Sequence, residues 1–97
     1  MSARDRPARS DLVGYLELID RFVGREIDDG PFEAEYLRMV KDDEVMHSDP
    51  AFGVIDELFF HVDEYFVPAD ASADERARAE EALRARARAA GERLRAL

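Results

Sequence analysis

The helical character of this chain is clearest in the segment Ala51–Phe66, which reads AFGVIDELFFHVDEYF. Its large apolar residues recur at intervals of three and four, which is the spacing of one face of a helix. The inner face predicted from this spacing consists of Phe52, Ile55, Leu58, Phe59, Val62 and Phe66. Asp49-Pro50 is typical of a cap followed by the first helical residue, and the turn Val67–Asp70 ends the segment.

Three further helices are predicted around this segment. The first has Ser10 as its N-cap and an inner face of Leu12, Tyr15, Leu16, Ile19, Phe22 and Val23. The second is capped by Asp28 or Asp29, with Pro31 in its first turn, and its inner face holds Phe32, Tyr36, Met39 and Val40. The last runs from Ala73 to about Arg95 after a capping box of Ser72 and Glu75, with an inner stripe of Leu83, Ala87, Ala90 and Leu94.

Four amphipathic helices joined by short loops indicate an all-α fold, a small antiparallel four-helix bundle. We expect a single four-helix domain over residues 10–97, preceded by a flexible N-terminal tail at residues 1–9. A chain of 97 residues is large enough for one modest core. It contains no cysteine, no apolar run long enough to span a membrane and no stretch resembling a secretory signal. These features predict a cytoplasmic protein without a membrane partner.

The charge of the chain is unevenly distributed. Residues 10–70 contain 17 Asp and Glu against 4 Lys and Arg, whereas residues 71–97 contain 7 Arg against 5 acids. The whole chain has a formal net charge of −9. Because concentrated charge of one sign destabilises a small domain by self-repulsion, this imbalance favours a basic protein partner or a need for solubility. A nucleic acid partner would require the opposite sign.

Metal binding and catalysis are both disfavoured by the motifs present. Glu44 and His47 have the Glu-x-x-His spacing of di-iron bundles, but such a site needs two of these motifs and two further carboxylates. Glu57 and His61 lie one helical turn apart and supply only two ligands. No nucleophile motif or glycine-rich phosphate loop is present. We therefore predict no metal, no cofactor and no enzymatic activity.

The outer face of the segment 51–66 is the strongest candidate for binding a partner. Phe60 lies far from the inner face on a helical wheel and is flanked by carboxylates, so it is either an exposed interface anchor or packs sideways against a neighbouring helix. A second acidic cluster precedes the same helix. The predicted partner-binding residues are Asp42, Asp43, Glu44, Asp56, Glu57, Phe60, Asp63 and Glu64.

Several stretches of the chain resemble the colicin D-type immunity proteins, the bacterial self-protective immunity family. The resemblance is carried by Tyr15–Val23, Glu26-Ile27-Asp28, Phe32-Glu33 with Tyr36-Leu37, and Leu58-Phe59 with Val62-Asp63 and Tyr65. It spans about residues 12 to 66 and fades over the Arg-rich fourth helix. It implies a four-helix bundle that covers the active site of a cognate nuclease toxin with acidic side chains, and it places Asp63 within the family's helix-three signature.

Two functions are consistent with these observations. The first is an immunity-type inhibitor of a nuclease toxin that cleaves RNA or tRNA, in which clustered carboxylates fill a basic groove in place of phosphates. The second is a regulatory or protein-interaction bundle that has a basic partner but no toxin. The sequence leaves the oligomeric state and the identity of the toxin open.

Overall fold

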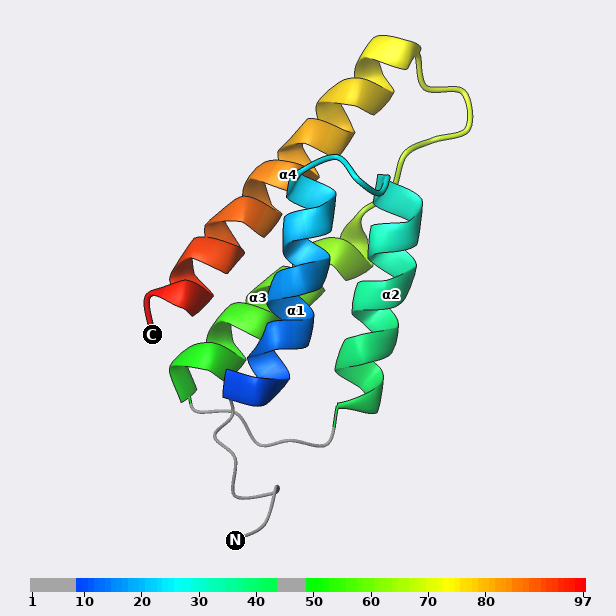
Figure 1. Ribbon diagram of the computed structural model, residues 1–97. Helices are drawn as coiled ribbons and strands as arrows, with labels where there is room; N and C mark the ends of the chain where they lie inside the picture. The colour runs from blue at the N-terminus through cyan, green and yellow to red at the C-terminus, as the bar shows by residue number, and fades with distance from the viewer. Residues whose placement is uncertain (1–8, 44–48) are drawn as a thin grey trace, which may run out of the picture.

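The computed structural model describes residues 9–43 and 49–97, which form four helices (Figure 1). They are α1 (Arg9–Val23), α2 (Asp29–Asp42), α3 (Asp49–Glu64) and α4 (Ala73–Arg95). Successive helices run in opposite directions and pack against one another, and α4 returns to pack against α1. The predicted all-α, antiparallel four-helix bundle is thereby confirmed.

The core lies between the pair α1 and α2 and the pair α3 and α4. Phe22 and Phe32 stack with their ring centroids 4.3 Å apart, and Tyr36 packs beside Phe32 at 5.7 Å. The Tyr36 hydroxyl donates a hydrogen bond of 2.8 Å to the carbonyl oxygen of Ile55, so this buried polar group has a partner. Burial raises the pKa of Tyr36 far above its ordinary value, which keeps the hydroxyl protonated as a donor.

The inner face predicted for α3 is wrong at two positions. Phe52 is 57% exposed and Phe66, which lies beyond the end of the helix, is 77% exposed. Phe59 is only partly buried against the core. The buried positions of α3 are Ala51, Val54, Ile55, Leu58 and Val62. One residue corresponds to 100° of rotation on a helix, so placing small Ala51 inside turns Phe52 outward.

The helix ends follow the predicted capping chemistry with some differences. At α4 the Glu75 amide donates to the Ser72 hydroxyl oxygen at 3.1 Å and the Ser72 amide donates to the Glu75 carboxylate at 2.8 Å, confirming the capping box. Asp28 is the N-cap of α2, without a side-chain hydrogen bond. Two predicted caps are wrong, because Ser10 is the second residue of α1 and Asp49 is the first residue of α3.

The fourth helix packs through the thin stripe predicted for it. Leu83, Ala87, Ala90 and Leu94 are all buried. Gly91 allows a close approach to α1, because a Cβ atom at this position would lie 3.2 Å from the Ile19 side chain. The small residues of this stripe thus let α4 cover the core without a broad apolar face.

Candidate functional site

The outward side of α3 presents both aromatic and acidic side chains. Phe60 is 56% exposed, which confirms that it is an outward-facing residue and not part of the core. Asp56, Asp63 and Glu64 are also exposed. Their orientation follows from Leu58 and Val62, which are buried on the opposite side of the helix.

The neighbouring helix α2 adds two carboxylates that the sequence analysis missed. Burial raises the pKa of Glu33, and the nearby negative charges of Asp29 and Asp63 raise it further. Glu33 of α2 therefore lies close enough to Asp29 and to Asp63 of α3 to be repelled by both. We call the carboxylates Asp29, Glu33, Asp56, Asp63 and Glu64 the acidic face, with Glu64 at its edge toward α4, near Arg86. The sequence alone could not place Glu33 near Asp63, because this requires knowing that α2 packs beside α3.

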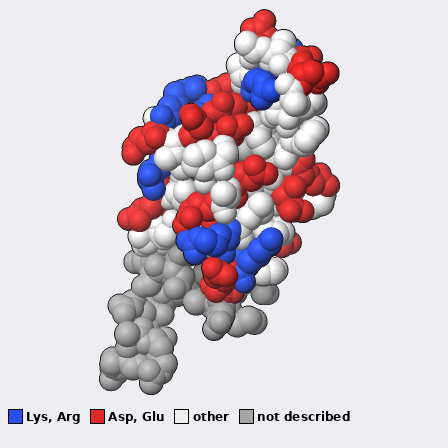
Figure 2. Space-filling view, turned by 90° about the vertical axis from the view of Figure 1, so that its right-hand side faces the viewer, with Lys and Arg blue, Asp and Glu red and all other residues white. Residues whose placement is uncertain are grey.

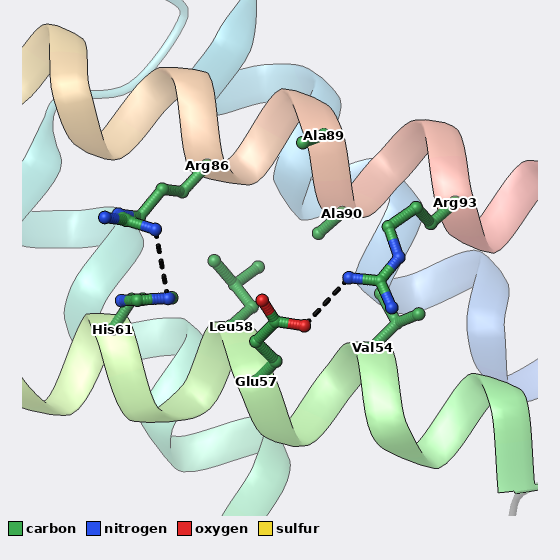
Figure 3. A pocket seen from close by; sticks show the side chains of 8 residues that line it. All are labelled: Val54, Glu57, Leu58, His61, Arg86, Ala89, Ala90 and Arg93. Atoms are coloured by element: carbon green, nitrogen blue, oxygen red, sulfur yellow. Dashed lines mark hydrogen bonds and ion pairs between the residues drawn. The ribbon is translucent and has the colours of Figure 1, made fainter.

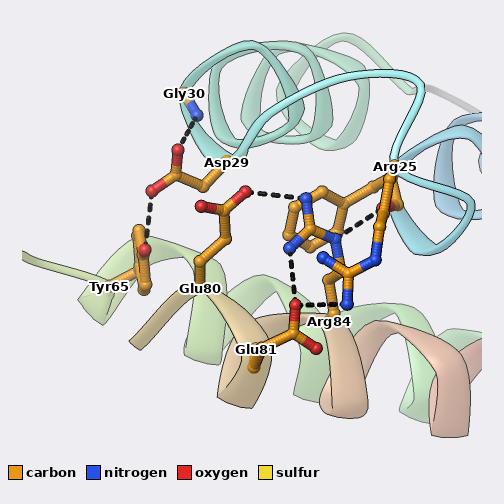
Figure 4. A network of polar contacts seen from close by, with 8 residues as sticks. Arg25, Asp29, Gly30, Tyr65, Glu80, Glu81 and Arg84 are labelled. Atoms are coloured by element: carbon orange, nitrogen blue, oxygen red, sulfur yellow. Dashed lines mark hydrogen bonds and ion pairs between the residues drawn. The ribbon is translucent and has the colours of Figure 1, made fainter. Parts of the chain in front are cut away.

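A tyrosine at the end of α3 fixes one edge of the acidic face. The Tyr65 hydroxyl donates a hydrogen bond of 2.6 Å to the Asp29 carboxylate, whose other oxygen accepts from the Gly30 amide at 2.9 Å (Figure 4). Burial and this contact raise the pKa of Tyr65 well above its ordinary value, so the phenol stays protonated. The hydrogen bond joins the end of α3 to the start of α2 and holds the carboxylates of the two helices on one side.

Arginines of α4 neutralise carboxylates on other parts of the molecule. Arg93 pairs with Glu57 at 2.8 Å, and Arg95 pairs with Asp20 at 2.5 Å. By contrast, within residues 9–43 and 49–97 no ion pair involves Asp56, Asp63 or Glu64. Figure 2 looks onto the side of the molecule where α2 lies and shows Asp and Glu side chains spread across it, together with several Lys and Arg side chains and uncharged surface. These three carboxylates of α3 thus differ from Glu57 and Asp20, which have arginine partners from α4.

Glu57, which was predicted to bind the partner, belongs to a different surface. It points toward α4 and lines a small pocket of about 80 Å³ with His61, Arg86 and Arg93 (Figure 3). The hydrogen bond from Arg93 lowers the pKa of Glu57 below its ordinary value. His61 Nε2 lies 3.1 Å from a guanidinium nitrogen of Arg86. Because Glu57 has an intramolecular partner, we leave it out of the acidic face.

The predicted cluster before α3 is only partly described. Asp42 pairs with Arg38 at 3.3 Å on the surface, and Asp43 accepts a hydrogen bond of 2.6 Å from the Tyr15 hydroxyl. Both lie where α2 ends, at the end of the bundle where α3 begins (Figure 1). Glu44 lies outside the described residues. The same is true of His47, so the Glu-x-x-His motif is not placed.

A buried arginine on α4 was also missed by the sequence analysis. Arg84 is 4% exposed, and its Nε donates to the Phe22 carbonyl oxygen at 2.9 Å. Its two terminal nitrogens donate to Glu80 at 2.7 Å and Glu81 at 2.9 Å (Figure 4). The guanidinium also lies 4.8 Å from the centre of the Phe22 ring, a cation–π contact. The ion pairs of Arg84 with Glu80 and Glu81 could be predicted from their spacing of four and three residues on one helix. The hydrogen bond to the Phe22 carbonyl could not be predicted from that spacing.

Comparison with known proteins gives one match. The family model for bacterial self-protective colicin-like immunity matches residues 11–94, so the similarity continues through α4, beyond the stretch expected from the sequence. No curated protein and no solved structure matches the chain. None of the helices in the described part of the chain is long and apolar enough to cross a membrane. Among the same residues, no three His, Asp or Glu side chains are grouped as metal ligands would be.

Proposed function

Because the chain belongs to the bacterial self-protective colicin-like immunity family, we propose that it binds and inhibits a cognate nuclease toxin, one that cleaves RNA or tRNA. The acidic face would cover the basic groove in which the toxin grips its substrate. The inhibitor acts by occlusion and needs no catalytic group or cofactor of its own. We place this binding in the cytoplasm, where the toxin would meet its RNA substrate.

One observation carries this proposal. Glu57 and Asp20 have arginine partners from α4, whereas Asp56, Asp63 and Glu64 have no ion-pair partner among the described residues. Burial raises the pKa of Glu33, and repulsion by Asp29 and Asp63 raises it further. A cationic partner would relieve that repulsion. A nuclease groove that binds phosphates is such a partner, because it must present Lys and Arg to a polyanion.

The geometry also supports fast and lasting inhibition. Complementary charge steers association, with rate constants that reach about 10⁸–10⁹ per molar per second at low salt. An exposed aromatic side chain such as Phe60 adds apolar contact area, which slows dissociation once the water between the surfaces has been expelled. Charge would thus govern encounter, and the aromatic contact would govern residence time.

Protection of cells provides the direct test. The nuclease domain encoded beside the gene for this chain is expressed together with wild-type protein or with the triple variant Asp56→Asn, Asp63→Asn and Glu64→Gln. The variant removes three charges while keeping side-chain size. We expect the wild type to protect the cells and the variant to lose affinity by at least about 100-fold, so that its cells die.

A matched control removes three charges elsewhere. Glu17, Asp70 and Glu92 are exposed and form no ion pair with any described residue, so Glu17→Gln, Asp70→Asn and Glu92→Gln change the net charge equally. This control is expected to protect like the wild type. Equal protection by both triple variants would mean that the acidic face serves only solubility. Failure of the wild type to protect would remove the nuclease as partner.

A further inference from the structure

Four exposed residues of α3 form a regular row along the outside of the helix. Phe52, Asp56, Phe60 and Glu64 follow one another at intervals of four residues, and all four are exposed. Residues four apart are neighbours on a helix surface, separated by about 6 Å along its axis. The row therefore alternates an aromatic ring and a carboxylate in successive turns. We call these four residues the α3 ridge.

The two phenylalanines of this ridge have no evident role in the fold. More than half of each side chain is exposed, although the core beneath them is closed by Ala51, Val54 and Leu58. Large exposed aromatic residues that line up on one face are characteristic of interaction surfaces rather than of a solvated helix. Phe52 in particular was assigned to the core by its spacing, but in the structure its side chain is exposed.

The charge of the α3 ridge indicates which class of partner it can bind. Asp56 and Glu64 have no ion-pair partner among the described residues, and the exposed Asp63 directly precedes Glu64 in the chain. A second copy of this chain would place like charges against one another across the interface, which is unfavourable. A nucleic acid would be repelled for the same reason. The ridge is complementary instead to a protein surface that carries cations between apolar pockets.

We propose that the α3 ridge is a two-anchor docking element for a basic protein surface. Phe52 and Phe60 would each fill an apolar pocket about 12 Å apart along the helix, and Asp56 would meet a Lys or Arg held between those pockets. Glu64 would meet a second cation beyond Phe60. This inference rests on the proposed function and adds to it that recognition depends on the order of the aromatic and acidic side chains as well as on net charge.

Dissociation kinetics test the two anchors. The probe is the purified nuclease domain encoded beside the gene, bound to immobilised wild-type protein, Phe52→Ser or Phe60→Ser. Each variant is expected to raise the dissociation rate constant at least about tenfold, with the association rate constant within about threefold of wild type. Val13→Ser is the control, since Val13 is an apolar residue that is 44% exposed on α1 and lies outside α3. It should dissociate like the wild type.

A variant with the same composition tests the order of the ridge. The double variant Asp56→Phe and Phe60→Asp keeps the net charge and the number of aromatic residues and exchanges two exposed positions. We expect it to bind at least about 100-fold more weakly while its circular dichroism and thermal unfolding match the wild type. Affinity equal to that of the wild type would overturn the proposed order.

The outcomes separate this inference from the proposed function. If the wild type binds the nuclease domain and both phenylalanine variants dissociate at the wild-type rate, the ridge is overturned and the immunity function stands. If the wild type does not bind, both proposals fail together. A dimer of the free chain in sedimentation, dispersed by Phe52→Ser, would assign the ridge to self-association instead and would also overturn the proposal.

Discussion

At the scale of single residues, Arg84 shows how a charged side chain can become part of the core. Its guanidinium is almost fully buried, yet the Phe22 carbonyl, Glu80 and Glu81 together satisfy it. An arginine in a charged helical segment is ordinarily assigned to the surface. Helical spacing could indicate the two glutamates on its own helix, but the carbonyl belongs to a residue 62 positions away.

Replacing this arginine should therefore be costly. Arg84→Ala removes the packing against Phe22 and the ion pair of the partly buried Glu80, and it leaves the Phe22 carbonyl oxygen with only the Arg25 amide as donor among the described residues. We expect the free energy of unfolding to fall by about 3 kcal/mol. Urea denaturation of both variants measures this, with Arg88→Ala as the control because Arg88 is exposed on the same helix. The control should stay within about 0.5 kcal/mol of the wild type. If Arg84→Ala lowers the free energy of unfolding by no more than the control does, the buried contacts of Arg84 contribute little to stability.

At the scale of secondary-structure elements, α3 shows the limit of what apolar spacing can predict. The pattern indicated the helix and its approximate end, but two overlapping registers fit apolar spacings of three and four, and both contain Ile55, Leu58 and Val62. The register with Phe52 and Phe66 inside contains the larger side chains. The fold uses the one with Ala51 and Val54. Only the helices packed against α3 determine which register is buried.

The candidate site was predictable in the same partial way. The outward position of Phe60 and the acidic side chains around it followed from the helical wheel, as did the inner stripe of α4. The partners across helices did not, because spacing along one helix contains no information about its neighbours. Hence Glu57 was grouped with Asp56, although it faces Arg93, and Glu33 was overlooked, although it lies near Asp63.

The pairing of α2 with α3 makes a prediction about pH. Burial, with help from Asp29 and Asp63, raises the pKa of Glu33 above its ordinary value of 4.5. The folded protein thus retains this proton to higher pH than the unfolded chain. The stability gained is present below the unfolded pKa and is lost as the pH rises through the folded pKa.

Glu33→Gln should accordingly stabilise the protein at pH 7, and its advantage should vanish as the pH falls below about 4.5. Thermal unfolding at pH 7 and pH 4 compares the variant with the wild type. Glu17→Gln is the control, since Glu17 is exposed on α1, and it should change the unfolding temperature little at either pH. A Glu33→Gln protein less stable than the wild type at pH 7 would contradict the repulsion inferred for the acidic face.

At the scale of the whole molecule, the charge imbalance of the sequence becomes a difference between sides. Arginines of α4 pair with carboxylates of α1 and α3, and the acidic face on α2 and α3 has no such pairing among the described residues. A field of this kind acts at a distance, and salt screens it with a Debye length of about 10 Å at 0.1 M.

Association with the proposed nuclease partner should therefore depend strongly on ionic strength. We expect the association rate constant to fall at least about tenfold between 50 and 500 mM salt, and the dissociation rate constant to change much less. Stopped-flow measurements at several salt concentrations give both constants. The association rate constant of the triple variant of Asp56, Asp63 and Glu64 should fall less with increasing salt than that of the wild type. Salt-independent association would indicate that shape alone guides the encounter.

The lack of ion-pair partners on the acidic face also has an evolutionary consequence. Side chains such as Asp56 and Glu64 have no such partner among the described residues, so substituting them leaves the core and the arginine pairs of α4 intact. Most surface substitutions of this kind change stability by less than about 0.5 kcal/mol. The face can therefore accumulate mutations almost neutrally with respect to folding. A lineage built on this bundle could change which partner it recognises one residue at a time, without passing through unfolded intermediates.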